Sequence, residues 1–164
     1  MKPDARGRVR AVAGAVLALA SLLLLRPSVA AAPEDEFVES YKWLEGASGY
    51  GEAQRLAKAS GRPVVVYFYT DWCHYCRELE RELLETPHVK AYLRGLVKVR
   101  VNPEAGPAED AVGQRHGVAA YPAFFIGSPR TGSFVPVRRH VTRDGEQRLM
   151  TPAEFVASCR KAGG

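Results

Sequence analysis

A hydrophobic run followed closely by two cysteines is the feature that most limits what this chain can fold into. Residues 64–69 (Val-Val-Val-Tyr-Phe-Tyr) are β-branched or aromatic at consecutive positions, which is typical of a strand buried on both faces of a sheet. Cys73 and Cys76 follow, and the pattern after them predicts a helix over 73–85 that ends before Thr86-Pro87. The sequence therefore predicts a strand–turn–helix unit with the cysteine pair at the start of the helix.

Helices and strands alternate along the rest of the chain. The predicted helices cover 52–60, 88–94 and 109–116 and a last segment opened by Thr151-Pro152, and the predicted strands cover 96–101, 123–126 and 134–141. Pro136 has no N–H to donate to a ladder, so the last of these strands is expected at a sheet edge. This order predicts an α/β fold with a mixed central sheet and helices on both faces.

The first 32 residues have the layout of an export signal. A basic segment over 2–10 precedes 15 small and apolar residues over 11–25, and small residues follow over 28–32. We expect a signal peptide over 1–30 with cleavage near Ala30 (±2), a lead-in segment over 31–50 and a domain over 51–164. The apolar run is shorter than the roughly 20 residues of a membrane span, and an uncleaved anchor over 11–25 is the alternative. The expected location is exported, periplasmic or otherwise extracytoplasmic.

The net charge of +5 is also explained by this N-terminus. Residues 1–32 hold five of the 23 basic residues but one of the 18 acidic residues, so the remainder is close to neutral. A nucleic-acid partner, which needs a basic surface on the folded domain, is not expected.

The spacing of Cys73 and Cys76 suits reversible disulfide chemistry. Cysteines three apart at a helix start have Cα atoms about 5–5.5 Å apart, within the range that a disulfide tolerates. Cys73 would lie near the N-cap, where unpaired N–H groups and the helix dipole favour a thiolate. Cys76 shares a face with Leu79 and Leu83. We therefore expect Cys73 to be the exposed attacking thiol and Cys76 the shielded resolving thiol.

The residues around the cysteines do not favour haem attachment or metal binding. Haem attachment needs a histidine directly after the second cysteine, where this chain has Arg77. Zinc or copper binding needs more ligands than one Cys-x-x-Cys pair offers, and a permanent structural disulfide stays open as an alternative. Cys159 is expected to be a buried core thiol, with a regulatory or intermolecular thiol as the alternative.

Two segments resemble the landmarks of the thioredoxin superfamily. Asp71-Trp72-Cys73-His74-Tyr75-Cys76 after a hydrophobic strand resembles the active site of that family, and residues 117–125 (Gly-Val-Ala-Ala-Tyr-Pro-Ala-Phe-Phe) resemble its cis-proline segment. The resemblance covers about residues 50–162 and, in detail, is greatest to exported thioredoxin-like domains such as the C-terminal domain of DsbD. It implies a thioredoxin-like fold with a cis Tyr121–Pro122 bond beside the cysteine pair.

The resemblance also implies a function. The chain would be a thiol–disulfide oxidoreductase acting on protein disulfides, reductase or isomerase rather than oxidase, with no metal and no cofactor beyond the Cys73–Cys76 disulfide. Its partners would be protein disulfides or dithiols and an upstream thiol–disulfide protein. Trp72, His74, Tyr75, Tyr121 and Pro122 are the expected substrate-contacting residues. A non-catalytic binding module or a metal chaperone is the alternative.

One departure from the family is visible in the sequence. Thioredoxins carry a buried aspartate six residues before the first cysteine, and Tyr67 stands at that place here. The group that would assist the resolving thiol in place of the aspartate is therefore not identified by the sequence.

Overall fold

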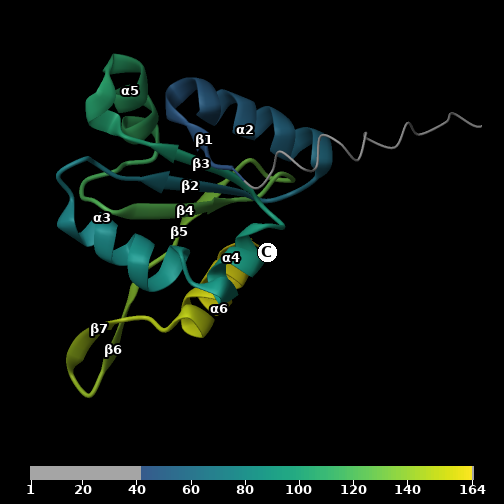
Figure 1. The fold of residues 1–164 in the computed structure, drawn as a ribbon. Helices are drawn as coiled ribbons and strands as arrows, with labels where there is room; N and C mark the ends of the chain where they lie inside the picture. Colours follow the sequence, from purple (N-terminus) through teal and green to yellow (C-terminus); the bar gives the residue numbers. More distant parts are fainter. Residues whose placement is uncertain (1–41, 164) are drawn as a thin grey trace, which may run out of the picture. The chain divides into compact units, whose positions relative to one another are not determined.

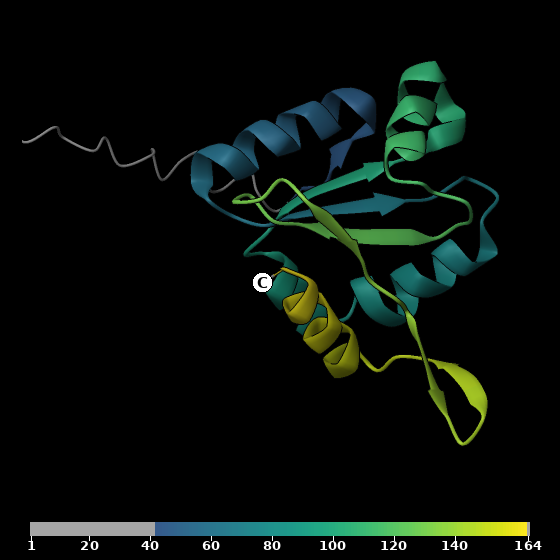
Figure 2. The same cartoon turned by 180° about the vertical axis from the view of Figure 1, so that it is seen from behind.

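The computed structural model describes residues 42–163, so the predicted signal peptide, the possible anchor over 11–25 and most of the lead-in segment lie outside the described residues. A central five-stranded sheet has the order β1-β3-β2-β4-β5, and helices cover both of its faces (Figures 1 and 2). This is the mixed α/β arrangement that the sequence predicts. In chain order the elements are β1 (Leu44–Glu45), α2 (Gly46–Ser60), β2 (Val64–Phe68), α3 (His74–Leu79), the π-helix η2 (Glu80–Leu84), α4 (Pro87–Leu93), β3 (Val97–Val101), the 3₁₀ turn η3 (Pro103–Ala105), α5 (Pro107–Arg115), β4 (Ala123–Gly127), β5 (Phe134–Pro136), β6 (His140–Arg143), β7 (Glu146–Leu149) and α6 (Pro152–Gly163).

Strand β2 is the centre of the core. It pairs in parallel with β3 and antiparallel with β4, and all of its residues are buried. Val65 and Tyr67 belong to a cluster with α3, η2, α4 and α6, whereas Val64, Val66 and Phe68 belong to a second cluster with α2 and α5. Because both faces are covered, the strand is apolar at every position instead of alternating.

The register of β2 and β4 decides where the cysteine pair lies. Phe68, the last residue of β2, is opposite Ala123, the first residue of β4. The turn that leads to Cys73 and the segment that ends at Pro122 therefore meet at one edge of the sheet.

Helix α2 begins at Gly46, six residues before the predicted start at Glu52. The segment before Glu52 contains Gly46, Gly49 and Gly51, and Gly49 serves close packing. A Cβ at Gly49 would lie 3.0 Å from the carbonyl carbon of Leu44, so a larger residue there would push the helix and β1 slightly apart. The pairing of β1 with β3 was not predicted, because a strand of two residues leaves no periodic pattern.

The helix predicted over 73–85 consists of α3 and η2. The π-type turn shows in the hydrogen bond from the Glu85 N–H to the Glu80 carbonyl, at 2.8 Å. Such wider turns occur as single insertions in α-helices and have no simple sequence signature. In this chain the π-type turn η2 carries the buried residues Leu83 and Leu84, and a separate helix, α4, begins at Pro87.

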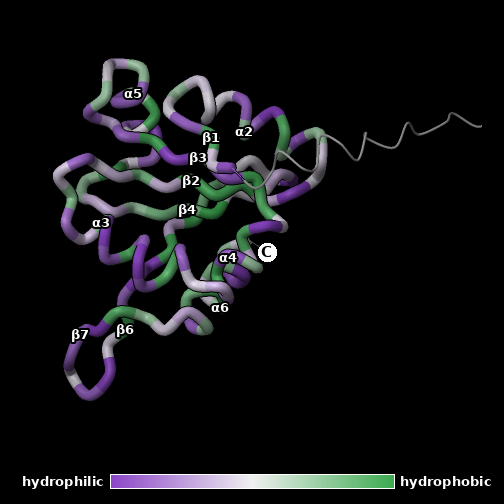
Figure 3. The backbone as a smooth tube through the Cα atoms, in the orientation of Figure 1, coloured by the Kyte–Doolittle hydropathy of each residue, from purple (hydrophilic) through white to green (hydrophobic). Residues whose placement is uncertain are grey.

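The segment predicted as one strand over 134–141 is divided. β5 pairs with β4 at the edge of the sheet, which confirms the position expected from Pro136. The chain then leaves the sheet and forms a separate β6–β7 hairpin. The tip of this hairpin is hydrophilic, whereas hydrophobic stretches are concentrated in the sheet (Figure 3).

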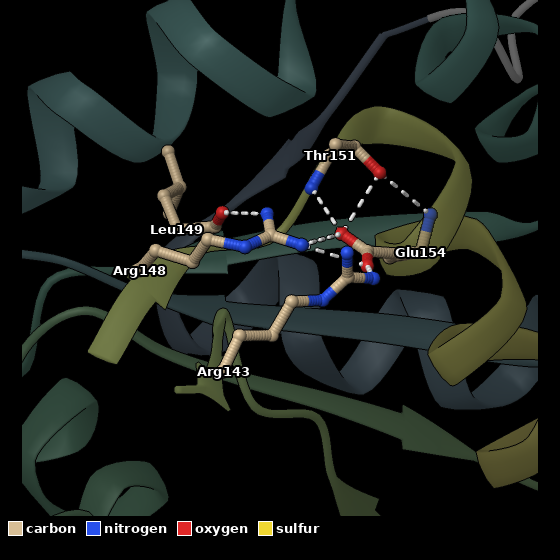
Figure 4. Close-up of polar contacts among 5 residues, drawn as sticks. All are labelled: Arg143, Arg148, Leu149, Thr151 and Glu154. Atoms are coloured by element: carbon tan, nitrogen blue, oxygen red, sulfur yellow. Dashed lines mark hydrogen bonds and ion pairs between the residues drawn. The ribbon is translucent and has the colours of Figure 1, made fainter. Parts of the chain in front are cut away.

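Glu154, in the first turn of α6, attaches the hairpin to the domain (Figure 4). Arg143 forms an ion pair with its carboxylate, and Arg148 Nη2 donates to Oε1 at 3.0 Å. The Thr151 N–H donates to Oε2 at 2.8 Å. The bonds from Thr151, together with those from the two arginines, lower the pKa of Glu154 to about 2.

Within residues 42–163, no helix has both the length and the hydrophobicity that crossing a lipid bilayer requires.

Candidate functional site

Cys73 and Cys76 form a disulfide at the N-terminus of α3. The Sγ atoms are 2.06 Å apart and the Cα atoms 5.2 Å apart, within the spacing predicted from the sequence. Cys73 is the N-cap residue, and its Sγ accepts a hydrogen bond from the Cys76 N–H at 3.1 Å. An N–H of the first helical turn therefore points at the Cys73 sulfur, in the position that stabilises a thiolate.

The predicted contrast in exposure between the two cysteines is wrong for this disulfide form. Cys73 and Cys76 are each 2% exposed, and both belong to the core cluster that includes Tyr67 and Leu79. Tyr121 packs against the same cluster. The two sulfurs differ in their place on α3, at the cap and one turn inward, and not in accessible surface.

Exposed aromatic side chains flank the buried disulfide. Trp72 is 66% and Tyr75 57% exposed, unusual values for large aromatic side chains. Trp72 Nε1 donates to Glu104 Oε2 at 2.8 Å, and its ring centroid lies 6.3 Å from that of Tyr121. The indole is thus held in place while most of its surface stays open. His74 is exposed, and its ring lies 5.8 Å from the Tyr75 ring.

The segment before β4 completes the site. The Tyr121–Pro122 peptide bond is cis, the form that the family resemblance implies. Both residues are half-buried, and the ring contact of Tyr121 with Trp72 joins this segment to the cysteine turn. The structure therefore brings Trp72, His74, Tyr75, Tyr121 and Pro122 to the same edge of the sheet as the disulfide.

Tyr67 has a hydrogen-bond partner that was not predicted from the sequence. Its hydroxyl donates to Glu80 Oε1 at 3.0 Å and lies 3.5 Å from the Cys76 carbonyl oxygen. Burial, reinforced by the Glu80 carboxylate, raises the pKa of Tyr67. Glu80 follows Cys76 by four residues, so the i,i+4 spacing was a signal that could have found it.

Cys159 takes no part in the disulfide. It is fully buried in α6 beside Phe155 and Val156, which confirms the predicted core thiol. Burial raises the pKa of the Cys159 thiol to about 12.

Metal ligands do not converge in the part of the chain that the structure describes. No group of three or more His, Cys, Asp or Glu side chains there is arranged to hold a metal ion.

Comparison with known proteins agrees with this arrangement. A family model described as thioredoxin-like matches residues 43–129. The thiol:disulfide interchange protein DsbD of Ralstonia nicotianae is 34% identical over 142 residues, which are 86% of this chain but 22% of that protein. The chain thus spans about a fifth of the length of this relative.

Solved structures show the same fold. A thioredoxin from Thermus thermophilus is 29% identical with a TM-score of 0.55, over 74% of this chain and 86% of that one. The oxidised C-terminal domain of DsbD from Neisseria meningitidis is 20% identical with a TM-score of 0.56, over 74% of this chain and 99% of that one. The residues matched by the family model include the cysteine pair and the cis-proline segment, and the chain belongs to the thioredoxin-like family.

Proposed function

We propose that this chain is a thiol–disulfide oxidoreductase that acts on protein disulfides through Cys73 and Cys76. The observation that carries the proposal is the Cys73–Cys76 disulfide at the start of α3, beside a cis Tyr121–Pro122 segment. The similarity to a thiol:disulfide interchange protein over most of the chain supports it.

Reduction of a client takes two exchange steps. The Cys73 thiolate attacks one sulfur of a client disulfide, so the client S–S bond breaks, one client thiolate leaves, and Cys73 is joined to the other client sulfur. The Cys76 thiolate then attacks Cys73, releasing the second client thiolate and forming the Cys73–Cys76 bond. Two electrons pass to the client, and the two protons of the reduced cysteines end on its thiols.

The position of each sulfur supports this assignment of roles. The hydrogen bond from the Cys76 N–H stabilises negative charge on the Cys73 sulfur, both when Cys73 attacks and when it leaves. Cys76 lies further along α3, on the same face as Leu79, which is the place expected for a resolving thiol. Reduction breaks the S–S bond, and we expect the Cys73 side chain then to reach the surface between Trp72 and Tyr75.

The exposed aromatic residues are proposed to hold the client. Trp72 and Tyr75 offer open ring surface on either side of the disulfide, and the backbone at Tyr121 and Pro122 offers hydrogen-bonding groups to an extended client chain. His74, exposed between the cysteines, would contact the same segment.

Electrons for each cycle would come from an upstream dithiol protein, which reduces the Cys73–Cys76 disulfide by the same exchange in reverse. No metal and no organic cofactor is needed for thiol–disulfide exchange. The layout of the first 32 residues supports export to the periplasm or another extracytoplasmic compartment.

Catalysed reduction of insulin by dithiothreitol tests the proposal. The wild-type chain should accelerate the precipitation of insulin chains, and Cys73→Ser and Cys76→Ser should abolish the acceleration. Cys159→Ala is the matched control, because this cysteine lies outside the disulfide, and should retain it. A wild-type chain that binds a client without accelerating its reduction would refute the enzyme assignment in favour of a binding module.

A further inference from the structure

A pocket of about 510 Å³ opens beside the cis-proline segment, on the side of the sheet that carries α3. Its apolar walls come from α3, the start of β4 and the chain after β5, and residues of the β6–β7 hairpin also line it. The lining includes Leu79, Pro122, Phe124, Val137, Arg138 and Arg139. The size suits one or two side chains of a bound polypeptide.

The arginines of this segment fall into two groups. Arg143 and Arg148 are paired with Glu154 and hold the hairpin in place (Figure 4). Arg138 and Arg139 line the pocket, and neither forms an ion pair with any carboxylate among residues 42–163. One pair of arginines therefore holds the hairpin, whereas the charges of Arg138 and Arg139 are not balanced by a carboxylate partner in the described part of the chain.

Arg139 connects the pocket with the redox site. Its Nη1 donates to the Pro122 carbonyl oxygen at 3.3 Å, and its guanidinium lies 5.6 Å from the ring centroid of Tyr75. Its buried Nε has no hydrogen-bond partner within the described part of the chain, and a buried donor of this kind is costly to leave unsatisfied. A guanidinium binds carboxylates and phosphates with two parallel hydrogen bonds, and of these groups an unmodified polypeptide supplies the carboxylate.

The remaining charges nearby leave the pocket cationic at neutral pH. Burial lowers the pKa of His140, with Arg139 lowering it further and Glu78 opposing the shift, so this imidazole is neutral at pH 7. Glu78 is the carboxylate whose charge acts on His140, but it is not part of the pocket wall. The two positive charges of Arg138 and Arg139 exceed the single negative charge of Glu78.

We propose that this pocket binds an acidic side chain of the client polypeptide, and that preferred clients carry Asp or Glu within a few residues of their reactive cysteine. The proposal rests on the proposed function and adds the class of client. Charge complementarity favours this occupant, as does the continuity of the pocket with Tyr75 and Pro122, which flank the disulfide. An apolar floor of Leu79, Phe124 and Val137 suits the methylene groups of a glutamate.

Matched disulfide-linked peptides test this proposal. One peptide carries Glu on both sides of the cysteine and the other carries Gln, and kcat/KM for their reduction is measured at low and high salt. The wild-type chain should reduce the Glu peptide faster, by about fivefold at low salt, because a charge at a rim acts mainly on association. The preference should shrink at high salt.

Three variants test which arginines cause the preference for the Glu peptide. Arg138→Gln and Arg139→Gln should each bring the Glu/Gln ratio of kcat/KM close to one. Arg130→Gln removes the same charge from the β4–β5 turn, at the opposite end of β4 from Pro122, and should retain the wild-type ratio. Because Arg138 is exposed, its replacement changes the charge of the pocket and leaves the packing of the hydrophobic core unchanged.

The outcomes separate the two proposals. Equal turnover of both peptides by the wild-type chain, or a preference that survives both pocket variants, overturns the acidic-client proposal and leaves the oxidoreductase assignment standing. Turnover of neither peptide overturns the oxidoreductase assignment and the client class with it.

Discussion

At the scale of single residues, Cys73 and Cys76 have the same burial and different positions on α3. Cys73 is the N-cap residue and its Sγ accepts a hydrogen bond from the Cys76 N–H, whereas Cys76 lies within the helix. Spacing and helix position were readable from the sequence because both follow from i,i+3 geometry. The exposure of the two cysteines could not be predicted in this way. It depends on residues distant in sequence, such as Tyr121, which packs against the core cluster that contains both cysteines.

Alkylation of the reduced, folded protein should distinguish the three thiols. With iodoacetamide at pH 7.5, chosen as about one unit below the ordinary thiol pKa, Cys73 should be modified first. Cys159 should stay unmodified until the protein unfolds, because burial raises its pKa to about 12. Peptide mapping by mass spectrometry over time gives the order, and modification of Cys76 or Cys159 before Cys73 would contradict it.

Tyr67→Phe tests the hydrogen bond at the place where the family has aspartate. The free energy of unfolding should fall by about 1 kcal/mol, because the bond from the hydroxyl to Glu80 is lost. Tyr69→Phe is the matched control: Tyr69 is half-buried, and its ring stacks on Tyr67 at 5.7 Å. Urea denaturation of both variants measures the difference, and equal losses would show that the Tyr67 hydroxyl contributes nothing specific.

At the scale of elements, the central strands β2, β3 and β4 were predicted well because each has a sustained apolar or alternating pattern, whereas the two-residue β1 was not predicted. The consecutive apolar residues of β2 require cover on both faces, and the structure supplies it with α2 and α5 on one side and α3, α4 and α6 on the other (Figures 1 and 2). The start of α2, the π-type turn of η2 and the β6–β7 hairpin were missed. Two of them depend on particular side-chain or backbone contacts, of Gly49 with Leu44 and of Arg143 with Glu154, which a pattern of apolar residues does not reveal.

Glycine replacements should separate close packing from helix propensity. A Cβ at Gly127 in β4 would lie 2.5 Å from Phe134 Cε1 and 2.7 Å from Val64 Cγ1. Gly127→Ala should therefore destabilise the fold by about 2 kcal/mol or more. Gly51→Ala, inside α2 with nothing within 4 Å of the new Cβ, should stabilise it by about 0.5–1 kcal/mol. Thermal unfolding of both variants checks the signs, and a neutral Gly127→Ala would contradict the packing of β4 against β5.

At the scale of the whole molecule, stability should decrease as the solution becomes mildly acidic. His116 is half-buried against Phe68, Phe125 and Phe134, and burial, with Arg115, lowers its pKa below the usual 6.5. The unfolded chain therefore takes up this proton first, so the stabilisation is complete above pH 6.5 and is lost as the pH falls below that value.

His116→Gln should flatten this dependence. Unfolding free energies of the wild type and the variant, measured from pH 8 to pH 5 in steps of about half a unit, should converge toward the acid end. A variant with the same slope as the wild type would show that the buried imidazole is not the titrating group.

Catalysis by the site as a whole requires that Cys73 attacks the client and that Cys76 resolves the intermediate. The most direct test is the trapping of a mixed disulfide with a client protein, analysed by non-reducing electrophoresis and mass spectrometry. Cys76→Ser should accumulate a covalent adduct joined through Cys73, and Cys73→Ser should accumulate none. An adduct formed through Cys76, or none with either variant, would contradict the account.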